Sequence, residues 1–238
     1  MAALTHPLCI QLDTSISLKM SQFATAFAQE PTVITNIDGQ PIEFTHIREV
    51  WLRWWKQTKY GKAVADGAVA HWLLEETERR AFFASRYNAV ERLLFELDPS
   101  VQCLLDLFRR PGMPLFEWAI MGPIATSIKA HVDIFGTASW NLLLCGQKTW
   151  KFWPPDANPN RNSPIFTFKQ NQAQLIWIPE GWWHGVDYHT AALCLSKNLV
   201  PMRSLPKIAN AAVGRAPSLE PYLSALMSIR SQIHAITM

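Results

Sequence analysis

Residues 131 to 153 read HVDIFGTASWNLLLCGQKTWKFW, a segment that mixes polar side chains with aliphatic and aromatic runs. Short apolar runs bounded by glycine are typical of β-strands. We predict one strand on each side of Cys145-Gly146-Gln147, joined there as a hairpin, with Lys148 just past the turn. Short aromatic-rich runs of the same kind continue from residue 114 to 200, so this part of the chain is expected to form a mainly β core.

His131 and Asp133 stand two residues apart at the start of this segment. Because side chains of an extended chain alternate between two faces, both would point to the same face of a strand. A second histidine, His184, ends the run IWIPEGWWH at residues 176–184. Two imidazoles and one carboxylate are the ligands of a non-haem iron(II) facial triad. A histidine followed two residues later by an acid is common by chance, so the surrounding strand pattern is what gives the pair its weight.

Further motifs accompany this cluster, namely FEWAIMGP at 116–123, GQK at 146–148 and PEGWWH at 179–184. Together with HVDIFGTASWN at 131–141, they resemble the Jumonji C (JmjC) dioxygenases of the cupin superfamily, and most closely the Jumonji lysyl hydroxylases. The resemblance extends over about residues 113 to 200. It is fainter over residues 23–37, where Pro31-Thr32-Val33-Ile34 is similar to the family's leading strand.

This resemblance implies a double-stranded β-helix, the cupin or jelly-roll fold, which binds iron(II) and the cosubstrate 2-oxoglutarate and uses O2. The expected fold class is therefore α+β with a mainly β core, and with helices at both ends of the chain. Carried over position by position, the catalytic iron ligands would be His131, Asp133 and His184.

Four residues match cosubstrate-binding positions of the family: Lys148, Asn141, Ser196 and Asn198. Lys148 would hold the distal carboxylate of 2-oxoglutarate, since a dianion in a dry barrel requires a buried cation. The alternative is a solvated lysine beside a turn. Asn141 could instead only satisfy a strand edge, and Ser196 and Asn198 could only end the last strand before Pro201.

The chain departs from the family pattern at two places. Ile128 stands three residues before the first iron ligand, where relatives commonly have a threonine that hydrogen-bonds the cosubstrate. Ser127, Thr126 or a residue of the N-terminal region are candidates to replace that hydroxyl. Residues 171–174, Asn-Gln-Ala-Gln, replace the usual Gly-Asp turn, and we expect them to alter a loop at the barrel mouth.

We expect three parts, with a leading strand and helices at 1–112, the JmjC core at 113–200 and a helical tail at 201–238. The helical segments are marked by apolar stripes: Trp51, Trp54 and Trp55; Phe83, Tyr87, Val90, Leu94 and Leu97; Leu104, Leu105 and Phe108 after Ser100; and a last stripe after an N-cap at Ser218. The tail could fold back on the barrel, cover the site or pair with a second copy. JmjC relatives often dimerise through C-terminal helices, so a homodimer is expected.

Composition agrees with a soluble enzyme, since 238 residues with 49% hydrophobic and 17% charged side chains can bury a sizeable core. The net charge of +3 gives no basic stripe, so nucleic acid is not indicated as a partner. No secretion signal or membrane-spanning run is found, and four cysteines without metal spacing indicate reduced thiols in a cytoplasmic compartment. Most of the 11 tryptophans should pack, an aromatic cage for a cationic substrate being the alternative.

Three classes of function remain open on these grounds. The favoured class is a hydroxylase of an amino-acid side chain in a peptide or protein. A tailoring hydroxylase of a free amino acid or other small molecule would need the same residues and would differ only at the mouth. A zinc hydrolase, or a barrel that binds a ligand without catalysis, would use the same three metal ligands, but it would give Lys148 no reason to be buried.

Overall fold

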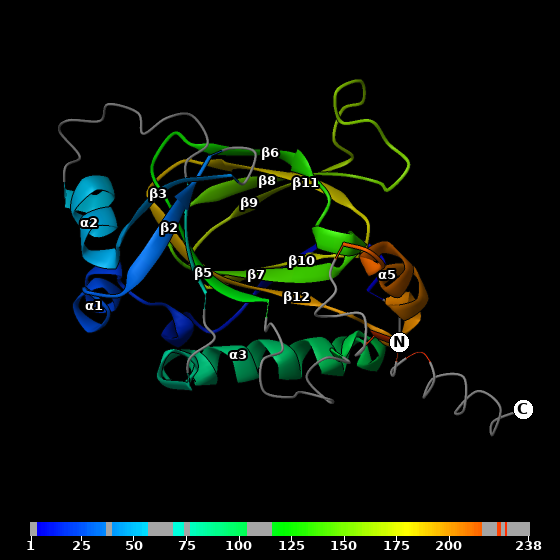
Figure 1. Ribbon diagram of the computed structural model, residues 1–238, viewed down its shortest axis with the longest axis horizontal. Helices are drawn as coiled ribbons and strands as arrows, with labels where there is room; N and C mark the ends of the chain where they lie inside the picture. The colour runs from blue at the N-terminus through cyan, green and yellow to red at the C-terminus, as the bar shows by residue number, and fades with distance from the viewer. Residues whose placement is uncertain are drawn as a thin grey trace, which may run out of the picture.

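Two antiparallel β-sheets face each other and enclose the centre of the molecule (Figure 1). The structure, a computed structural model, describes residues 4–36, 40–56, 69–73, 77–103 and 116–215, together with Leu223, Ser224 and Met227. The large sheet has the order β1 (Leu8–Gln11), β10 (Gln174–Ile178), β7 (Ala138–Cys145), β12 (Ala192–Leu199), β5 (Glu117–Gly122), β4 (Val69–Leu73), β2 (Pro31–Thr35) and β3 (Pro41–His46). The small sheet has the order β6 (Ser127–His131), β11 (Trp183–Tyr188), β8 (Lys148–Trp153) and β9 (Phe166–Gln170).

Alternate residues of the central strand β7 lie on opposite faces of the large sheet. Ser139 and Asn141 line the space between the two sheets, while Trp140 and Leu142 belong to the core on the opposite face. This alternation follows from the two-residue period of a strand. Both faces are covered, so seven of the eight residues of β7 are buried. The arrangement confirms the predicted double-stranded β-helix with a mainly β core and flanking helices.

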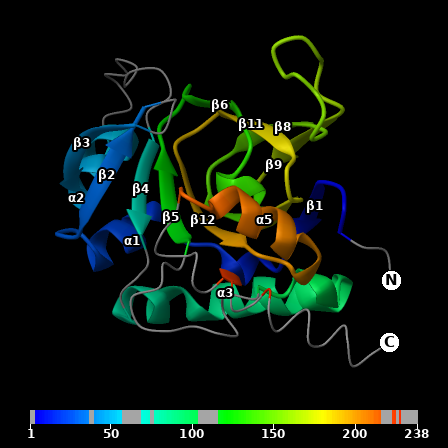
Figure 2. The same ribbon diagram turned by 45° about the vertical axis from the view of Figure 1, so that its right-hand side comes forward.

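Helix α3 (Thr77–Leu97) covers the outer face of the large sheet (Figures 1 and 2). The residues of its predicted stripe that are buried are Phe83, Tyr87, Val90 and Leu94. Their spacing of three and four residues places them on one face of the helix. Leu97 is 37% exposed, so the buried stripe ends one turn earlier than predicted. The helix stops before Pro99, as expected, whereas Leu104, Leu105 and Phe108 lie outside the described residues.

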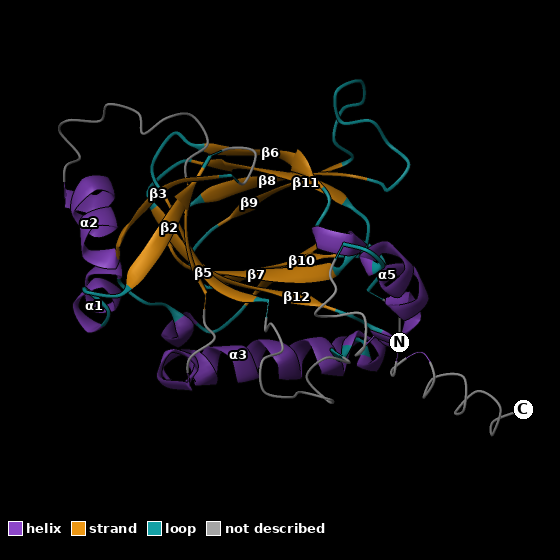
Figure 3. Ribbon diagram, in the orientation of Figure 1, coloured by secondary structure: helices purple, strands orange, loops and turns teal. Residues whose placement is uncertain are grey.

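The N-terminal third contains more strand than the sequence analysis predicted. Strand β2 was expected, but β3 and β4 were not, and all three extend the large sheet beyond β5. In the edge strand β3, Ile42 and Phe44 alternate with polar residues, but so short a pattern did not distinguish a strand from a loop, and both side chains are exposed, at 51% and 83%. Helices α1 (Met20–Ala26) and α2 (Ile47–Trp51) lie beside these strands, and the chain continues as a π-helical turn over Leu52–Lys56 (Figure 3). The predicted tryptophan stripe packs on the core: Trp54 is buried, and Trp51 and Trp55 are partly buried against it.

The predicted hairpin at Cys145-Gly146-Gln147 is wrong, although the turn itself is present. Strand β7 pairs with β10 and β12, whereas β8 pairs with β11 and β9, so the chain crosses here from one sheet to the other. Gly146 has a φ of +102°, and a Cβ at this position would lie 2.6 Å from the carbonyl oxygen of Ala191. Only glycine fits this sharp crossing. As a result, Lys148 begins a strand of the opposite sheet.

The turn at residues 171–174, which was expected to alter a loop at the barrel mouth, contributes no residue to the lining of the cavity between the sheets. The Ala173 N–H donates to the carbonyl of Leu143 at 2.9 Å, and the Asn171 side chain accepts a hydrogen bond from Gln147 at 2.8 Å. These partners stand at the end of β7 that is remote from Asp133. The sequence shows that a turn is present, but not at which end of the barrel it stands.

The C-terminal part begins with α5 (Leu205–Ala212), which packs against the 3-10 turn Ile134–Gly136. Leu223 is buried in the main core, whereas the predicted N-cap Ser218 lies outside the described residues. Within the described part of the chain, no helix has the length and apolar character needed to cross a membrane. None of the four cysteines forms a disulfide.

Candidate active site

A cavity of about 610 Å³ lies between the two sheets. Residues from β5, β6, β7, β8, β11 and β12 line it, together with Thr35 and Asn36 at the end of β2 and Val69 of β4. All seven side chains singled out from the sequence line this one cavity, namely His131, Asp133, Asn141, Lys148, His184, Ser196 and Asn198. The strands therefore bring together residues that are up to 67 positions apart in the chain, counted from 131 to 198.

His131, Asp133 and His184 form a potential metal-binding cluster in which one ligand atom of each lies within 4.8 Å of the others. His131 ends β6 and pairs directly with His184 on β11, and the two ring centroids are 4.3 Å apart. Asp133 follows β6 in an extended conformation, so its side chain returns to the same face as His131. Its Oδ1 is 4.0 Å from His184 Nε2.

Both imidazoles are held in the tautomer that suits a metal. The His131 Nδ1 lies 2.9 Å from the carbonyl of Lys129, and the His184 Nδ1 lies 3.2 Å from the carbonyl of Trp182. A carbonyl oxygen can only accept, so each Nδ1 carries the hydrogen and each Nε2 presents its lone pair. Burial, together with the nearby His131, lowers the pKa of His184 to about 4, so this ring is neutral at pH 7.

The Asp133 carboxylate is oriented by Ser139 on β7. The Ser139 hydroxyl donates to Asp133 Oδ2 at 2.5 Å, which leaves Oδ1 facing His184. The turn after Asp133 is tight, with Phe135 at φ +55° and the Gly136 N–H donating to the Asp133 carbonyl at 2.8 Å. A bulky residue in the left-handed region costs on the order of 1–3 kcal/mol and is retained only where its surroundings enforce it. Ser139 and this turn together fix the carboxylate.

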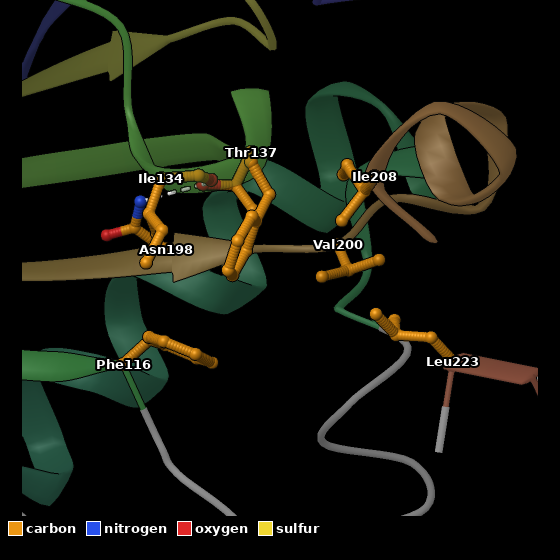
Figure 4. A pocket seen from close by; sticks show the side chains of 8 residues that line it. Phe116, Ile134, Thr137, Asn198, Val200, Ile208 and Leu223 are labelled. Carbon is orange, nitrogen blue, oxygen red and sulfur yellow. Dashed lines mark hydrogen bonds between the residues drawn. The ribbon is translucent and has the colours of Figure 1, made fainter. Parts of the chain in front are cut away.

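A small apolar pocket adjoins the main cavity, with which it shares Phe116, Ile134 and Asn198 (Figure 4). Across this pocket the Asn198 side-chain amide donates to the Thr137 hydroxyl at 2.8 Å. Asn198 therefore ties the end of β12 to the turn that carries Asp133. This hydrogen bond helps to fix the turn, and thereby the position of Asp133 in the metal-binding cluster.

Lys148 is only 1% exposed, so the alternative of a solvated lysine beside a turn is wrong. Its ammonium donates to Asn141 Oδ1 at 2.8 Å and to Cys194 Sγ at 3.4 Å, and it lies 5.0 Å from the Trp150 ring centroid. No carboxylate of the described residues pairs with it. Burial lowers the pKa of Lys148. A buried ammonium without an anion is unfavourable, and a bound carboxylate would relieve that cost.

Asn141, Ser196 and Asn198 differ in how their polar groups are used. Asn141 stands in the central strand β7 and points at Lys148, so it does not serve a strand edge. The Ser196 hydroxyl donates to the Trp140 carbonyl at 2.9 Å inside the sheet, and β12 continues beyond it to Leu199. Ser196 therefore does not end the strand. Of the three, only Asn141 contacts Lys148.

Ser139 and Tyr188 are two cavity residues that the sequence analysis did not assign to the site. Ser139 is two residues before Asn141, and Tyr188 is four residues after His184, so the two-residue period of a strand could have placed both inward. His189, by contrast, is exposed and makes a 2.6 Å hydrogen bond with Thr149 outside the cavity, as the predicted loop position requires.

A jelly-roll barrel that gathers two imidazoles, one carboxylate and an unpaired buried ammonium in a single cavity has the donor set of an iron(II)- and 2-oxoglutarate-dependent oxygenase. Proteins of similar sequence are named as demethylases, hydroxylases or oxygenases. The bifunctional arginine demethylase and lysyl-hydroxylase psr-1 of Caenorhabditis elegans is 24% identical over 165 residues, which are 50% of this chain and 41% of that protein. The 2-oxoglutarate and iron-dependent oxygenase JMJD4 of Mus musculus is 25% identical over 121 residues, 39% of this chain and 28% of that protein.

The chain is thus a distant homologue of JmjC-domain 2-oxoglutarate and iron-dependent oxygenases, and the predicted resemblance is confirmed. It spans less than half the length of the curated relatives it matches. No protein-family model matches the chain. Among solved structures, the Escherichia coli ribosomal oxygenase YcfD aligns with 88% of this chain and 53% of that chain, at 12% identity and a TM-score of 0.48.

Proposed function

We propose that this protein is an iron(II)- and 2-oxoglutarate-dependent oxygenase that hydroxylates an amino-acid side chain in a peptide or protein. The observation that carries the proposal is the Lys148 ammonium, which is buried in the same cavity as the His131, Asp133 and His184 cluster and has no anionic partner in the part of the chain that the structure describes. A metal-binding cluster alone would also suit zinc. The unpaired cation is what calls for an acidic cosubstrate.

Each residue has a defined task in this proposal. His131 Nε2, His184 Nε2 and Asp133 Oδ1 hold iron(II), which together with 2-oxoglutarate supplies O2 activation when bound. Lys148 holds the distal carboxylate of the cosubstrate, and Asn141 keeps the ammonium in place. The apolar walls of the cavity exclude water, which strengthens the charge-assisted contact to Lys148.

The substrate class is supported by the relatives more than by the cavity. The names of psr-1 and of the arginine-specific demethylase JMJ22 of Arabidopsis thaliana refer to arginine or lysine side chains, and JMJ22 is 25% identical over 142 residues, 46% of this chain and 28% of that protein. We therefore favour a peptide or protein side chain over a free amino acid or other small molecule. A zinc hydrolase is disfavoured because it needs a general base near the metal and has no use for Lys148.

Succinate release tests the proposed activity. Protein purified without oxygen is supplied with iron(II), 2-oxoglutarate and a lysate separated by size into peptide and metabolite fractions. We expect succinate together with a gain of one oxygen atom in a component of the peptide fraction. The His184→Ala variant is the matched control, and it should form no succinate. Equal turnover by the two proteins, or a requirement for zinc instead of iron, would refute the proposal.

A homodimer formed through the C-terminal tail and a cytoplasmic location stay predictions from the sequence. Leu223 of the tail is only 2% exposed within a single chain. This burial supports a tail that packs on its own barrel, and pairing with a second copy rests on the sequence resemblance alone. Light scattering of the full chain in solution distinguishes a monomer from a dimer.

A further inference from the structure

The wall of the cavity lacks a hydroxyl at the place where the JmjC resemblance implies one. Ile128 of β6 points into the cavity, while its neighbours Thr126 and Ser127 are not among the residues that line it. Two of the replacements considered from the sequence are therefore excluded. Thr35, from the N-terminal region, does line the cavity, but its hydroxyl is directed to the carbonyl of Val69 at 3.4 Å.

Tyr188 stands on the neighbouring strand, directly opposite Lys148. The two residues are a cross-strand pair of β11 and β8, and the Lys148 ammonium is 5.4 Å from the centroid of the Tyr188 ring. On the other side the ring fills the space above Gly122 of β5, where a Cβ would lie 2.3 Å from Tyr188 Cε1. The Tyr188 ring therefore lies between the backbone of Gly122 and the Lys148 ammonium, and strands of the two sheets fix its position.

The Tyr188 hydroxyl has no hydrogen-bond partner among the described residues, although the side chain is only 3% exposed and lines the cavity. Buried tyrosine hydroxyls normally find a partner. Burial raises the pKa of Tyr188 well above its ordinary value, so the phenol keeps its proton and can donate it. An ammonium cannot accept a hydrogen bond, so Lys148 offers the Tyr188 hydroxyl no acceptor, and one of its own three N–H groups is left after its bonds to Asn141 and Cys194.

We infer that Tyr188 is the second donor for the distal carboxylate of the cosubstrate, and that its hydroxyl on β11 replaces the one that Ile128 lacks on β6. This inference rests on the proposed function. It assigns the anion-binding end of the cavity to the cross-strand pair of Lys148 and Tyr188. One donor is charged and one is neutral, and a carboxylate has the two oxygens needed to accept from both.

The test compares two ligands that differ only in the distal carboxylate. The protein, loaded with Mn(II) so that no turnover occurs, is titrated calorimetrically with 2-oxoglutarate and with 2-oxobutanoate, which has no distal carboxylate. We expect the Tyr188→Phe variant to bind 2-oxoglutarate about tenfold more weakly than the wild type, as for the loss of a hydrogen bond to a charged group. Its affinity for 2-oxobutanoate should be unchanged.

The Tyr87→Phe variant is a matched control, because it removes a hydroxyl from another buried tyrosine, on α3 outside the barrel. It should bind both ligands as the wild type does. The inference is overturned if Tyr188→Phe binds 2-oxoglutarate like the wild type, or if it weakens both ligands equally, as a general packing defect would. A wild-type protein that does not prefer 2-oxoglutarate over 2-oxobutanoate would overturn the proposed function itself.

Discussion

Two lysines, Lys148 and Lys197, are each 1% exposed and stand in core strands, yet their surroundings differ. Lys197 faces the outside of the large sheet, 3.3 Å from Glu117 and 2.5 Å from Glu91. Lys148 faces the cavity, and its partners among the described residues are all neutral. A buried charge that is paired within the protein is already compensated, whereas a buried charge without a counter-ion is unfavourable until an oppositely charged ligand binds. This contrast at the level of single residues is the main support for an anionic cosubstrate.

Replacing Lys148 by methionine removes the charge and keeps most of the side-chain volume. We expect Lys148→Met to weaken 2-oxoglutarate binding by about ten- to a hundredfold, because a charge-assisted contact is lost. Calorimetric titration of the Mn(II)-loaded protein measures this change. Lys151→Met is the matched control, since Lys151 lies on the exposed face of the same strand in an ion pair with Asp187 at 2.7 Å. Unchanged affinity in Lys148→Met would show that another cation holds the cosubstrate.

Ser139 should act on the metal through Asp133. Its hydroxyl fixes Asp133 Oδ2, so Ser139→Ala frees the carboxylate to rotate away from the two histidines. Groups that orient a metal ligand typically change metal affinity about ten- to a hundredfold, and we expect a loss within that range. Anaerobic titration with iron(II) measures it. Ser127→Ala removes a hydroxyl from the strand that ends in His131 but outside the cavity, and it should bind iron normally. Equal loss in both variants would contradict an orienting role.

At the level of the elements, the ion cluster of Lys197, Glu117 and Glu91 fastens α3 to β5 and β12. Lys197→Met removes the ammonium that lies 3.3 Å from the fully buried Glu117 carboxylate, and loss of one partner of a buried pair costs about 3 to 5 kcal/mol. We expect a drop of this size in the free energy of unfolding, measured with urea. Glu91 is 42% exposed, so Glu91→Gln should lower the stability much less. Similar losses in the two variants would mean that the cluster is not what fastens the helix.

The strands of the core could be predicted from the sequence, but which strands pair with one another could not. The runs that became β7 and β8 show as strands because they are apolar and flank Gly146. Nothing local to them indicates that the chain changes sheet at this glycine, since the residues of β7 pair with residues of β10 and β12 that are 33 to 61 positions further along the chain. The edge strand β3 was missed because the alternation of Ile42 and Phe44 with polar residues covers only six positions.

The sequence predicted those site residues that can be recognised singly, and it missed those that depend on strand pairing. His131, Asp133, His184 and Lys148 followed from motif and charge. Ser139 required the register that brings it within reach of Asp133, and Tyr188 required the pairing that sets it opposite Lys148. Contacts of this kind depend on the three-dimensional arrangement, which a single sequence does not display.

At the scale of the whole molecule, one network joins four distant parts of the chain. The Arg203 guanidinium binds Asp98 at 2.9 Å, Glu180 at 2.5 Å and the carbonyl of Leu4 at 3.1 Å, and the Leu4 N–H donates to Asp98 at 2.8 Å. Glu180 belongs to the turn that leads into the strand of His184. The network thereby connects the N-terminal segment, the end of α3 and the segment after β12 to the turn that precedes β11, the strand of His184.

This network should make stability depend on pH through Asp98. Burial of the Asp98 carboxylate raises its pKa, but hydrogen bonds from Ser100, Leu4 and Arg203 outweigh burial and bring the pKa to about 2, below the ordinary 3.8. A lowered pKa gives stability that is complete above pH 3.8 and is lost as the pH falls toward 2, about 2 kcal/mol in all. The free energy of unfolding, measured with urea, should fall between pH 6 and pH 2 in both the wild type and Asp98→Asn. The fall should be about 2 kcal/mol smaller in Asp98→Asn than in the wild type. Asp156→Asn, at an exposed loop position, should follow the wild type. If all three proteins lost stability in parallel, the Asp98 carboxylate would not be the group through which acid loosens the ends of the chain from the barrel.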